Sequence, residues 1–136
     1  MFLEDWVAKR LKKFDFGVKF ERHLKRFTGR KWVFNDFDRW LNDSAKPVLF
    51  ILGKAGTGKS AIATKLAKSH PSVKAFHFCD FTMPETRNIR NGLRNMIYFL
   101  IANQNGYWDN LKNSRDEYNN LIDLANDQSE QQNLQV

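Results

Sequence analysis

Apolar residues recur at three- and four-residue spacing in several stretches of the chain, a period that is typical of amphipathic helices. The strongest match lies at about 88–103, where six apolar positions would share one helical face. The same spacing predicts helices over 31–41 and 59–69, and a shorter helix near 114–125. Residues 2–14 also fit a helix, with lysines and arginines crowded on the polar side.

Two short apolar segments lack this spacing. Residues 48–52 read "VLFIL" without a polar interruption, and residues 73–79 read "VKAFHFC" with partial alternation. Both patterns predict short strands, the first of them buried on both faces. A strand, a helix over 59–69 and a second strand would form one βαβ unit. The sequence therefore predicts an α/β fold with parallel strands, preceded by N-terminal helices.

A glycine-rich segment, "GKAGTGKS" at 53–60, follows the first predicted strand and matches G-x-x-x-x-G-K-[ST] at every required position. In that arrangement the backbone N–H groups of 56–60 bind phosphate oxygens at the positive end of a helix dipole. Lys59 would reach the β- and γ-phosphates, and the Ser60 hydroxyl would be a ligand of Mg²⁺. The candidate cofactor-binding residues of this segment are Gly53, Lys54, Ala55, Gly56, Thr57, Gly58, Lys59, Ser60 and Ala61.

The surroundings of the glycine-rich segment resemble the start of a known domain type. The resemblance is carried by "RFTGRKWVFNDFDRWL", "PVLFILGKAGTGKSAIATKLAKSHPSVKAFHFC" and "PETRNIRNGLRNMIYFLIAN". Together these segments resemble a NACHT-type domain of the STAND class of signalling P-loop ATPases, in particular the nephrocystin-like N-terminal type. The resemblance covers roughly residues 14–125.

The resemblance implies a partial three-layer P-loop NTPase fold that binds ATP with Mg²⁺, in a protein whose nucleotide state would switch assembly with other proteins. In relatives the Gly-Arg element lies near the adenine, so Gly29 and Arg30 become candidate nucleotide contacts. Lys31 stands where relatives often have Glu, which weakens any role for that position.

Hydrolysis needs a carboxylate on a neighbouring strand to hold Mg²⁺ and another to orient the attacking water. The only near match is "NNLIDLAND", and its Asp123 lies in a segment that is typical of a helix end. We therefore expect a fragment or truncated product that ends before the acidic strand and does not hydrolyse ATP alone. The predicted organisation is a helix and linker at 1–28, the N-terminal part of a nucleotide-binding domain at 29–125, and a disordered tail at 126–136.

Charge and composition narrow the partners. The net charge is +7, and residues 1–31 carry ten Lys/Arg against four Asp/Glu. No base-stacking or groove-reading motif accompanies this charge, so we expect a solvated basic face and a nucleotide site but no nucleic-acid partner. No apolar run approaches the roughly 18 residues that are needed to span a bilayer, and the single Cys79 excludes an intramolecular disulfide framework. We expect a cytoplasmic location.

The histidines favour structural interpretations. His77 and Cys79 are two residues apart, but a metal site needs about four ligands and no other cysteine exists, so we predict a packed strand there. His70 lies at the end of the helix over 59–69, where capping is favoured over catalysis. His23 lies in a basic stretch.

Four charged residues outside the glycine-rich segment are candidates for contact with the nucleotide or with a partner. Asp80 follows the second predicted strand, where turn formation is favoured over an approach to the nucleotide. Arg87, Arg90 and Arg94 follow one another at helical spacing, which favours a solvated face.

Two other functions fit the sequence. One is a small P-loop phosphotransferase, which would need an acidic partner on a strand. The other is a non-enzymatic interaction fragment, in which the helices at 2–14 and 88–103 contact a protein partner and the glycine-rich segment is idle.

Overall fold

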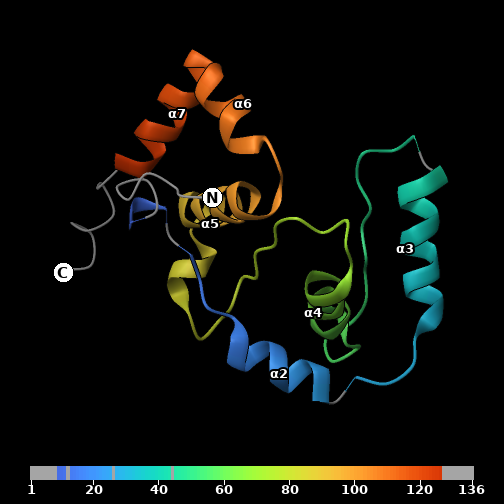
Figure 1. Cartoon of the computed structure of the whole chain (residues 1–136). Helices are drawn as coiled ribbons and strands as arrows, with labels where there is room; N and C mark the ends of the chain where they lie inside the picture. The colour runs from blue at the N-terminus through green and yellow to red at the C-terminus, as the bar shows by residue number, and fades with distance from the viewer. Residues whose placement is uncertain (1–8, 12, 26, 44, 127–136) are drawn as a thin grey trace. The chain divides into compact units, whose positions relative to one another are not determined.

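The structure is a computed structural model of the 136-residue chain, and its helices are labelled in Figure 1. It describes residues 9–11, 13–25, 27–43 and 45–126. Within these ranges it contains six α-helices and one short 3₁₀ helix, and no strand. None of these helices is both long enough and apolar enough to cross a membrane.

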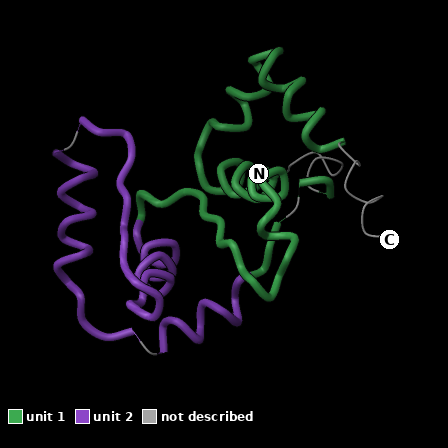
Figure 2. Tube along the Cα trace, turned by 180° about the vertical axis from the view of Figure 1, so that it is seen from behind, with its two compact units in different colours: residues 1–15, 71–136 green, residues 16–70 purple. Residues whose placement is uncertain are grey.

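The chain divides into two compact units, coloured separately in Figure 2. Unit 1 comprises residues 1–15 and 71–136, and unit 2 comprises residues 16–70. The glycine-rich segment at 53–60 therefore belongs to unit 2, whereas the helix predicted over 88–103 belongs to unit 1.

The predicted α/β fold is wrong, because neither predicted strand forms. Residues 48–52 have no regular secondary structure, and no hydrogen bond within the described chain uses their main-chain groups. Their five side chains are exposed by 38% to 87%. A strand exists only where its N–H and C=O groups pair with a neighbour. Residues 73–79, in unit 1, likewise lack regular structure, and the isolated bridge between Asp80 and Met83 is not a sheet.

Unit 2 is built from three helices: α2 (Gly17–Lys25), α3 (Lys31–Asp43) and α4 (Lys59–Ser69). Helices α3 and α4 confirm the predictions for 31–41 and 59–69. Helix α2 replaces a segment that we expected to be a linker.

The small core of unit 2 forms where α2 packs against α4. Phe16 and Phe20 are buried and stack with ring centroids 6.0 Å apart, and Ile62 and Leu66 are buried one helical turn apart on α4. Burying such side chains is the main source of stability for a short helix.

His70 ends α4 and confirms the capping interpretation. Its backbone N–H donates to the Leu66 carbonyl at 2.9 Å. Its imidazole Nε2 lies 2.9 Å from the Asp38 carboxylate on α3, and its ring meets Phe37 edge-on at 5.0 Å. The residue therefore joins α3 to the C-terminal end of α4.

Unit 1 contains the 3₁₀ helix η1 (Pro84–Arg87) and helices α5 (Ile89–Asn103), α6 (Tyr107–Asn113) and α7 (Arg115–Asn126). Helices α5 and α7 confirm the predictions for 88–103 and 114–125, and α6 was not predicted. The Asn88 side chain caps α5 by accepting hydrogen bonds from the N–H groups of residues 90 and 91. Figure 1 shows α6 and α7 as consecutive helices joined by a tight turn.

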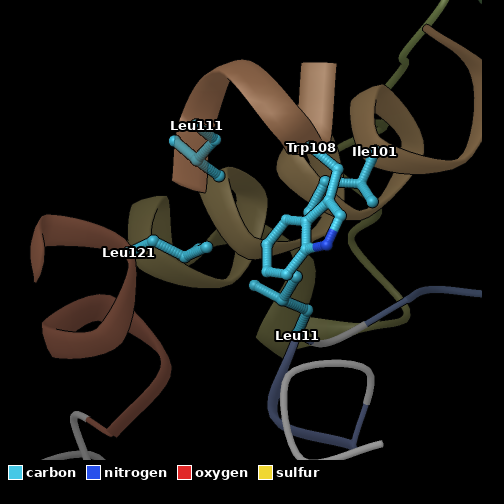
Figure 3. Packing of buried hydrophobic residues seen from close by; sticks show 5 residues of the cluster. All are labelled: Leu11, Ile101, Trp108, Leu111 and Leu121. Atoms are coloured by element: carbon cyan, nitrogen blue, oxygen red, sulfur yellow. The ribbon is translucent and has the colours of Figure 1, made fainter. Parts of the chain in front are cut away.

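The core of unit 1 is an apolar cluster drawn from four segments (Figure 3). Its members are Leu11, Ile101, Trp108, Leu111 and Leu121. Helix α6 contributes two of them at i, i+3 spacing, so even this seven-residue helix has one buried face. Close packing of this kind accounts for most of the stability of a small helical core.

A buried polar network lies beside this core. Asn95 is fully buried: its Oδ1 accepts from the Phe14 N–H at 2.9 Å, and its Nδ2 donates to the Phe76 carbonyl at 2.9 Å. Asn95 Nδ2 also lies 3.1 Å from His77 Nδ1, while His77 Nε2 lies 2.7 Å from the Thr86 carbonyl. These partners require a neutral imidazole whose Nε2 carries the proton.

This network corrects the interpretation of 73–79. His77 is packed, as predicted, but in an irregular segment and not in a strand. A Cβ at Gly92 would come within 3.3 Å of the His77 ring, so the close approach of α5 to this segment explains a glycine inside the helix. Cys79 is exposed, and the described part of the chain holds no group of three or more His, Cys, Asp or Glu side chains arranged for a metal.

The prediction of a solvated face for three arginines is wrong at Arg94. Arg94 is buried, its Nε donates to the Leu124 carbonyl at 2.8 Å, and its Nη1 donates to Asn91 Oδ1 at 3.1 Å. It thereby ties α5 to the last turn of α7, where carbonyls lack intrahelical partners. Arg87 and Arg90 are exposed, as predicted.

Asp80 confirms the turn interpretation. Its carboxylate accepts hydrogen bonds from the Thr82 N–H at 2.9 Å and from the Thr82 hydroxyl at 2.8 Å. Asp123 lies exposed on α7, in agreement with the helical interpretation of its segment.

The predictions for the two ends of the chain fall largely outside the described residues. Of the helix predicted over 2–14, residues 2–8 and 12 lie outside the described residues. Leu11 and Phe14 are buried in unit 1, but residues 13–16 are not helical. Ten residues of the predicted tail, 127–136, also lie outside the described residues.

Candidate phosphate-binding site

A cavity of about 580 Å³ opens beside the N-terminal end of α4 in unit 2. Its lining comes from α2, from the turn before α3, and from the 53–60 loop with the start of α4. The lining residues are Arg22, His23, Phe27, Thr28, Arg30, Gly56, Gly58, Lys59, Ser60 and Ala61. Cavities of roughly 300–1,000 Å³ accommodate small-molecule ligands, so the volume suits a mononucleotide.

The 53–60 loop turns sharply into α4 at two glycines in the left-handed region. Gly56 has a φ of 77°, and Gly58, the residue before α4, has a φ of 88°. Residues with a Cβ rarely adopt these angles, so the turn requires glycine at both positions.

The loop leaves the first amides of α4 without acceptors. No side chain caps this helix, and within the described chain no carbonyl accepts from the N–H groups of residues 58–61. Ile62 is the first residue whose N–H donates, to the Gly58 carbonyl at 3.0 Å. Unsatisfied N–H groups at the positive end of a helix dipole are a favourable environment for an anion.

The Lys59 side chain is hydrogen-bonded to the beginning of the 53–60 loop. Its ammonium Nζ donates to the Gly53 carbonyl at 2.6 Å and to the Lys54 carbonyl at 2.7 Å. The Thr57 hydroxyl donates to the same Lys54 carbonyl at 2.7 Å. These bonds hold the loop closed on itself, and they place the charge of Lys59 at the edge of the cavity.

Arg30 reaches the loop from the turn before α3. Gly29 and Arg30 both have positive φ, 77° and 58°, a conformation that costs a non-glycine residue on the order of 1–3 kcal/mol. The Arg30 guanidinium donates to the Thr57 carbonyl. A Cβ at Gly58 would lie only 3.1 Å from Arg30 Nη1, so the guanidinium rests directly on the loop.

The structure brings together only part of the predicted site. Arg30, Gly56, Gly58, Lys59, Ser60 and Ala61 line the cavity, whereas Gly53, Lys54, Ala55, Thr57 and Gly29 do not. Gly53, Lys54 and Thr57 instead supply backbone carbonyls to the two cationic side chains.

Four lining residues come from a part of the chain for which the sequence predicts a linker. Arg22 and His23 lie on α2, and Phe27 and Thr28 follow it. Phe27 is held by an edge-to-face contact with Phe34 of α3, with ring centroids 5.7 Å apart. The signal for α2 was present, because Phe16, Phe20 and Leu24 recur every four residues.

The electrostatics of the cavity favour an anion. Arg22, Arg30 and Lys59 line it, and no Asp or Glu is among the described residues that do. Cations gathered in a concave site raise the local concentration of negatively charged ligands. Asp80 and Asp123, the acids considered from the sequence, belong to unit 1.

With this geometry in view, the comparison with known families identifies the chain. It belongs to the family described as "Nephrocystin 3, N-terminal", whose model matches residues 28–135. The match begins just before Gly29 and Arg30 and includes the whole 53–60 loop and helices α3–α7. No curated protein and no solved structure matches the chain. The nephrocystin-like part of the resemblance is therefore confirmed.

Proposed function

We propose that unit 2 binds a nucleoside polyphosphate, with its phosphates on the 53–60 loop and the first turn of α4. The observation that carries this proposal is the set of N–H groups at residues 58–61, which lack acceptors at the edge of a cation-lined cavity. Phosphate oxygens are the strong acceptors that such groups can use.

Lys59 would change partners when a ligand binds. Its ammonium now donates to two loop carbonyls, and a phosphate oxygen is a stronger, charged acceptor at the same edge of the cavity. Binding would therefore exchange two neutral acceptors for an ionic one, and Lys59 would contribute more to affinity than to folding.

ATP with Mg²⁺ is the ligand that we propose. Bound Mg²⁺ would neutralise part of the phosphate charge, and Ser60, exposed in the first turn of α4, would supply its hydroxyl as a ligand. Mg²⁺ commonly keeps several waters and phosphate oxygens as its other ligands, so a single hydroxyl suits it. The preference for ATP over GTP rests on the resemblance to NACHT-type domains of the STAND class.

The proposal covers binding and not hydrolysis, because the described lining of the cavity offers no carboxylate to orient water. As in those signalling domains, we propose that the nucleotide state would control association with other proteins.

The test is a calorimetric titration of the full chain with a non-hydrolysable ATP analogue and Mg²⁺. Lys59→Ala should weaken binding at least tenfold, because it removes a charged donor. Lys68→Ala is the matched control on the same helix, since Lys68 is exposed and does not line the cavity. Equal affinity of the wild type and Lys59→Ala, or no binding by the wild type, would contradict the proposal.

A further inference from the structure

The geometry points to a specific role for Arg30: we infer that it is a positioning residue for the phosphate loop. Its guanidinium holds the peptide between Thr57 and Gly58, and it acts on the polyphosphate end of the ligand. The inference rests on the proposed function of the same cavity, and it assigns Arg30 to the phosphates where the family resemblance places it near the base.

The Arg30 guanidinium lies against the peptide between Thr57 and Gly58. It donates to the Thr57 carbonyl and covers Gly58 at a distance of 3.1 Å from a notional Cβ. The Thr57 carbonyl and the Gly58 N–H belong to one peptide plane. A group that fixes this carbonyl therefore fixes the direction of the Gly58 N–H, the first of the four N–H groups that lack acceptors.

The backbone that carries Arg30 is in the left-handed conformation. Two successive left-handed residues, Gly29 and Arg30, precede α3, and the Arg30 carbonyl accepts the first hydrogen bond of that region, from the Val33 N–H at 3.0 Å. An arginine in this conformation is unfavourable unless its surroundings compensate. The contact with the loop is the compensating interaction that the structure provides, and it ties α3 to the loop.

The lining residues divide the cavity into a loop end and an α2 end. Arg30 contacts the loop carbonyl of Thr57, and Lys59 contacts the loop carbonyls of Gly53 and Lys54. The lining also includes the aromatic Phe27 and the α2 residues Arg22 and His23. With two cations on the loop, the phosphates belong at the loop end and the base at the α2 end.

The test uses Arg30→Gly, since glycine adopts the left-handed conformation freely and should keep the turn intact. Binding of inorganic pyrophosphate and of a non-hydrolysable ATP analogue is measured for both proteins. We expect both ligands to weaken by the same factor, about tenfold. Millimolar guanidinium chloride should restore much of the affinity of Arg30→Gly, whereas equal sodium chloride should not.

Arg39→Ala is the control. Arg39 lies on the adjoining helix α3, exposed and paired at 3.3 Å with Asp36 of the same helix, and its loss should change neither affinity. Weaker binding of the ATP analogue with unchanged pyrophosphate binding would make Arg30 a base contact and overturn the inference. Unchanged binding of both ligands by Arg30→Gly would overturn it as well.

A measurement without ligand separates this inference from the proposed function. In a two-dimensional amide spectrum, Arg30→Gly should shift the Gly58 and Lys59 resonances, and Arg39→Ala should leave them in place. If the wild type binds neither ligand but these resonances shift, the proposed function fails and the positioning role stands. If the resonances stay in place, the positioning role is wrong whatever the ligands do.

Discussion

Unit 1 and unit 2 use their apolar residues in opposite ways. Unit 1 gathers leucine, isoleucine and tryptophan side chains from four segments into one buried cluster and satisfies the polar groups beside it. Unit 2 leaves the five residues of 48–52 exposed and leaves N–H groups without acceptors at the start of α4. Departures from good packing and full hydrogen bonding are expected where a site must bind something. We therefore expect unit 1 to contribute most of the stability, and the binding site that we propose lies in unit 2.

The largest expected effect on the free energy of unfolding comes from replacing a tryptophan by alanine, and each unit offers one tryptophan for this test. Trp108 of unit 1 is 5% exposed, and Trp32 of unit 2 is 67% exposed. Trp108→Ala should lower the free energy of unfolding by about 3–5 kcal/mol, because it opens a cavity in the core. Trp32→Ala should change it by less than about 0.5 kcal/mol. Urea unfolding followed by far-UV circular dichroism measures both; similar losses would erase the distinction.

The second test removes the hub of the polar network. Asn95→Ala leaves the Phe14 N–H and the Phe76 carbonyl without their partner, so we expect a loss of about 2–4 kcal/mol. Asn103→Ala is the matched control on α5, because Asn103 is exposed and donates a single bond to the Lys74 carbonyl at 3.0 Å. The same urea experiment applies, and a loss below that of the control would show that the network is not a stabilising element.

A smaller effect should appear at high pH in unit 1. Burial, and then the negative charge of Glu117, raise the pKa of the Tyr107 phenol above its ordinary value. The unfolded chain therefore releases this proton first, so the contribution is complete below about pH 10 and is lost as the pH rises towards the folded pKa. Because the side chain is partly exposed, the loss should stay below about 1 kcal/mol. From pH 9 to 11 the free energy of unfolding should decline less steeply in Tyr107→Phe than in the wild type. An identical slope in the two proteins would contradict this.

The smallest expected effect concerns the exposed run. Leu52 is 87% exposed in unit 2, whereas Leu121 is 3% exposed in unit 1. Leu121→Ala should cost about 2–5 kcal/mol and Leu52→Ala less than about 0.5 kcal/mol. If residues 48–52 formed a buried strand, replacing either leucine would lower the free energy of unfolding by a similar amount. Comparable losses in urea unfolding would therefore contradict the exposed position of Leu52.

The helical periodicity of apolar residues predicted the longer helices correctly, whereas short apolar runs predicted strands that do not form. Helices α3, α4 and α5 were found because their apolar residues repeat over at least ten positions. A run of five apolar residues such as 48–52 is too short to show a period. A strand also needs a neighbouring strand to pair with, and the run does not indicate which segment that would be. Helix α6 was missed because it is only seven residues long and buries just two of them, Trp108 and Leu111.

The candidate site was predicted where chemistry depends on local order and missed where it depends on packing. The spacing of Gly53–Ser60 predicted the turn into α4 and its loop, since a helix start is a local feature. The contact of Arg30 with Thr57 spans 27 residues, and the α2 side of the cavity depends on an unpredicted helix. Arg94 was placed on a solvated face because its acceptor, the Leu124 carbonyl, lies 30 residues away in sequence.

The central claim is that the N–H groups at the start of α4 receive the phosphates of a nucleotide. The most direct test is an amide spectrum of the full chain titrated with a non-hydrolysable ATP analogue and Mg²⁺. We expect the largest shifts at residues 58–61, with the resonances of α6 and α7 unchanged. Shifts confined to unit 1, or none at 58–61 at saturating ligand, would contradict it.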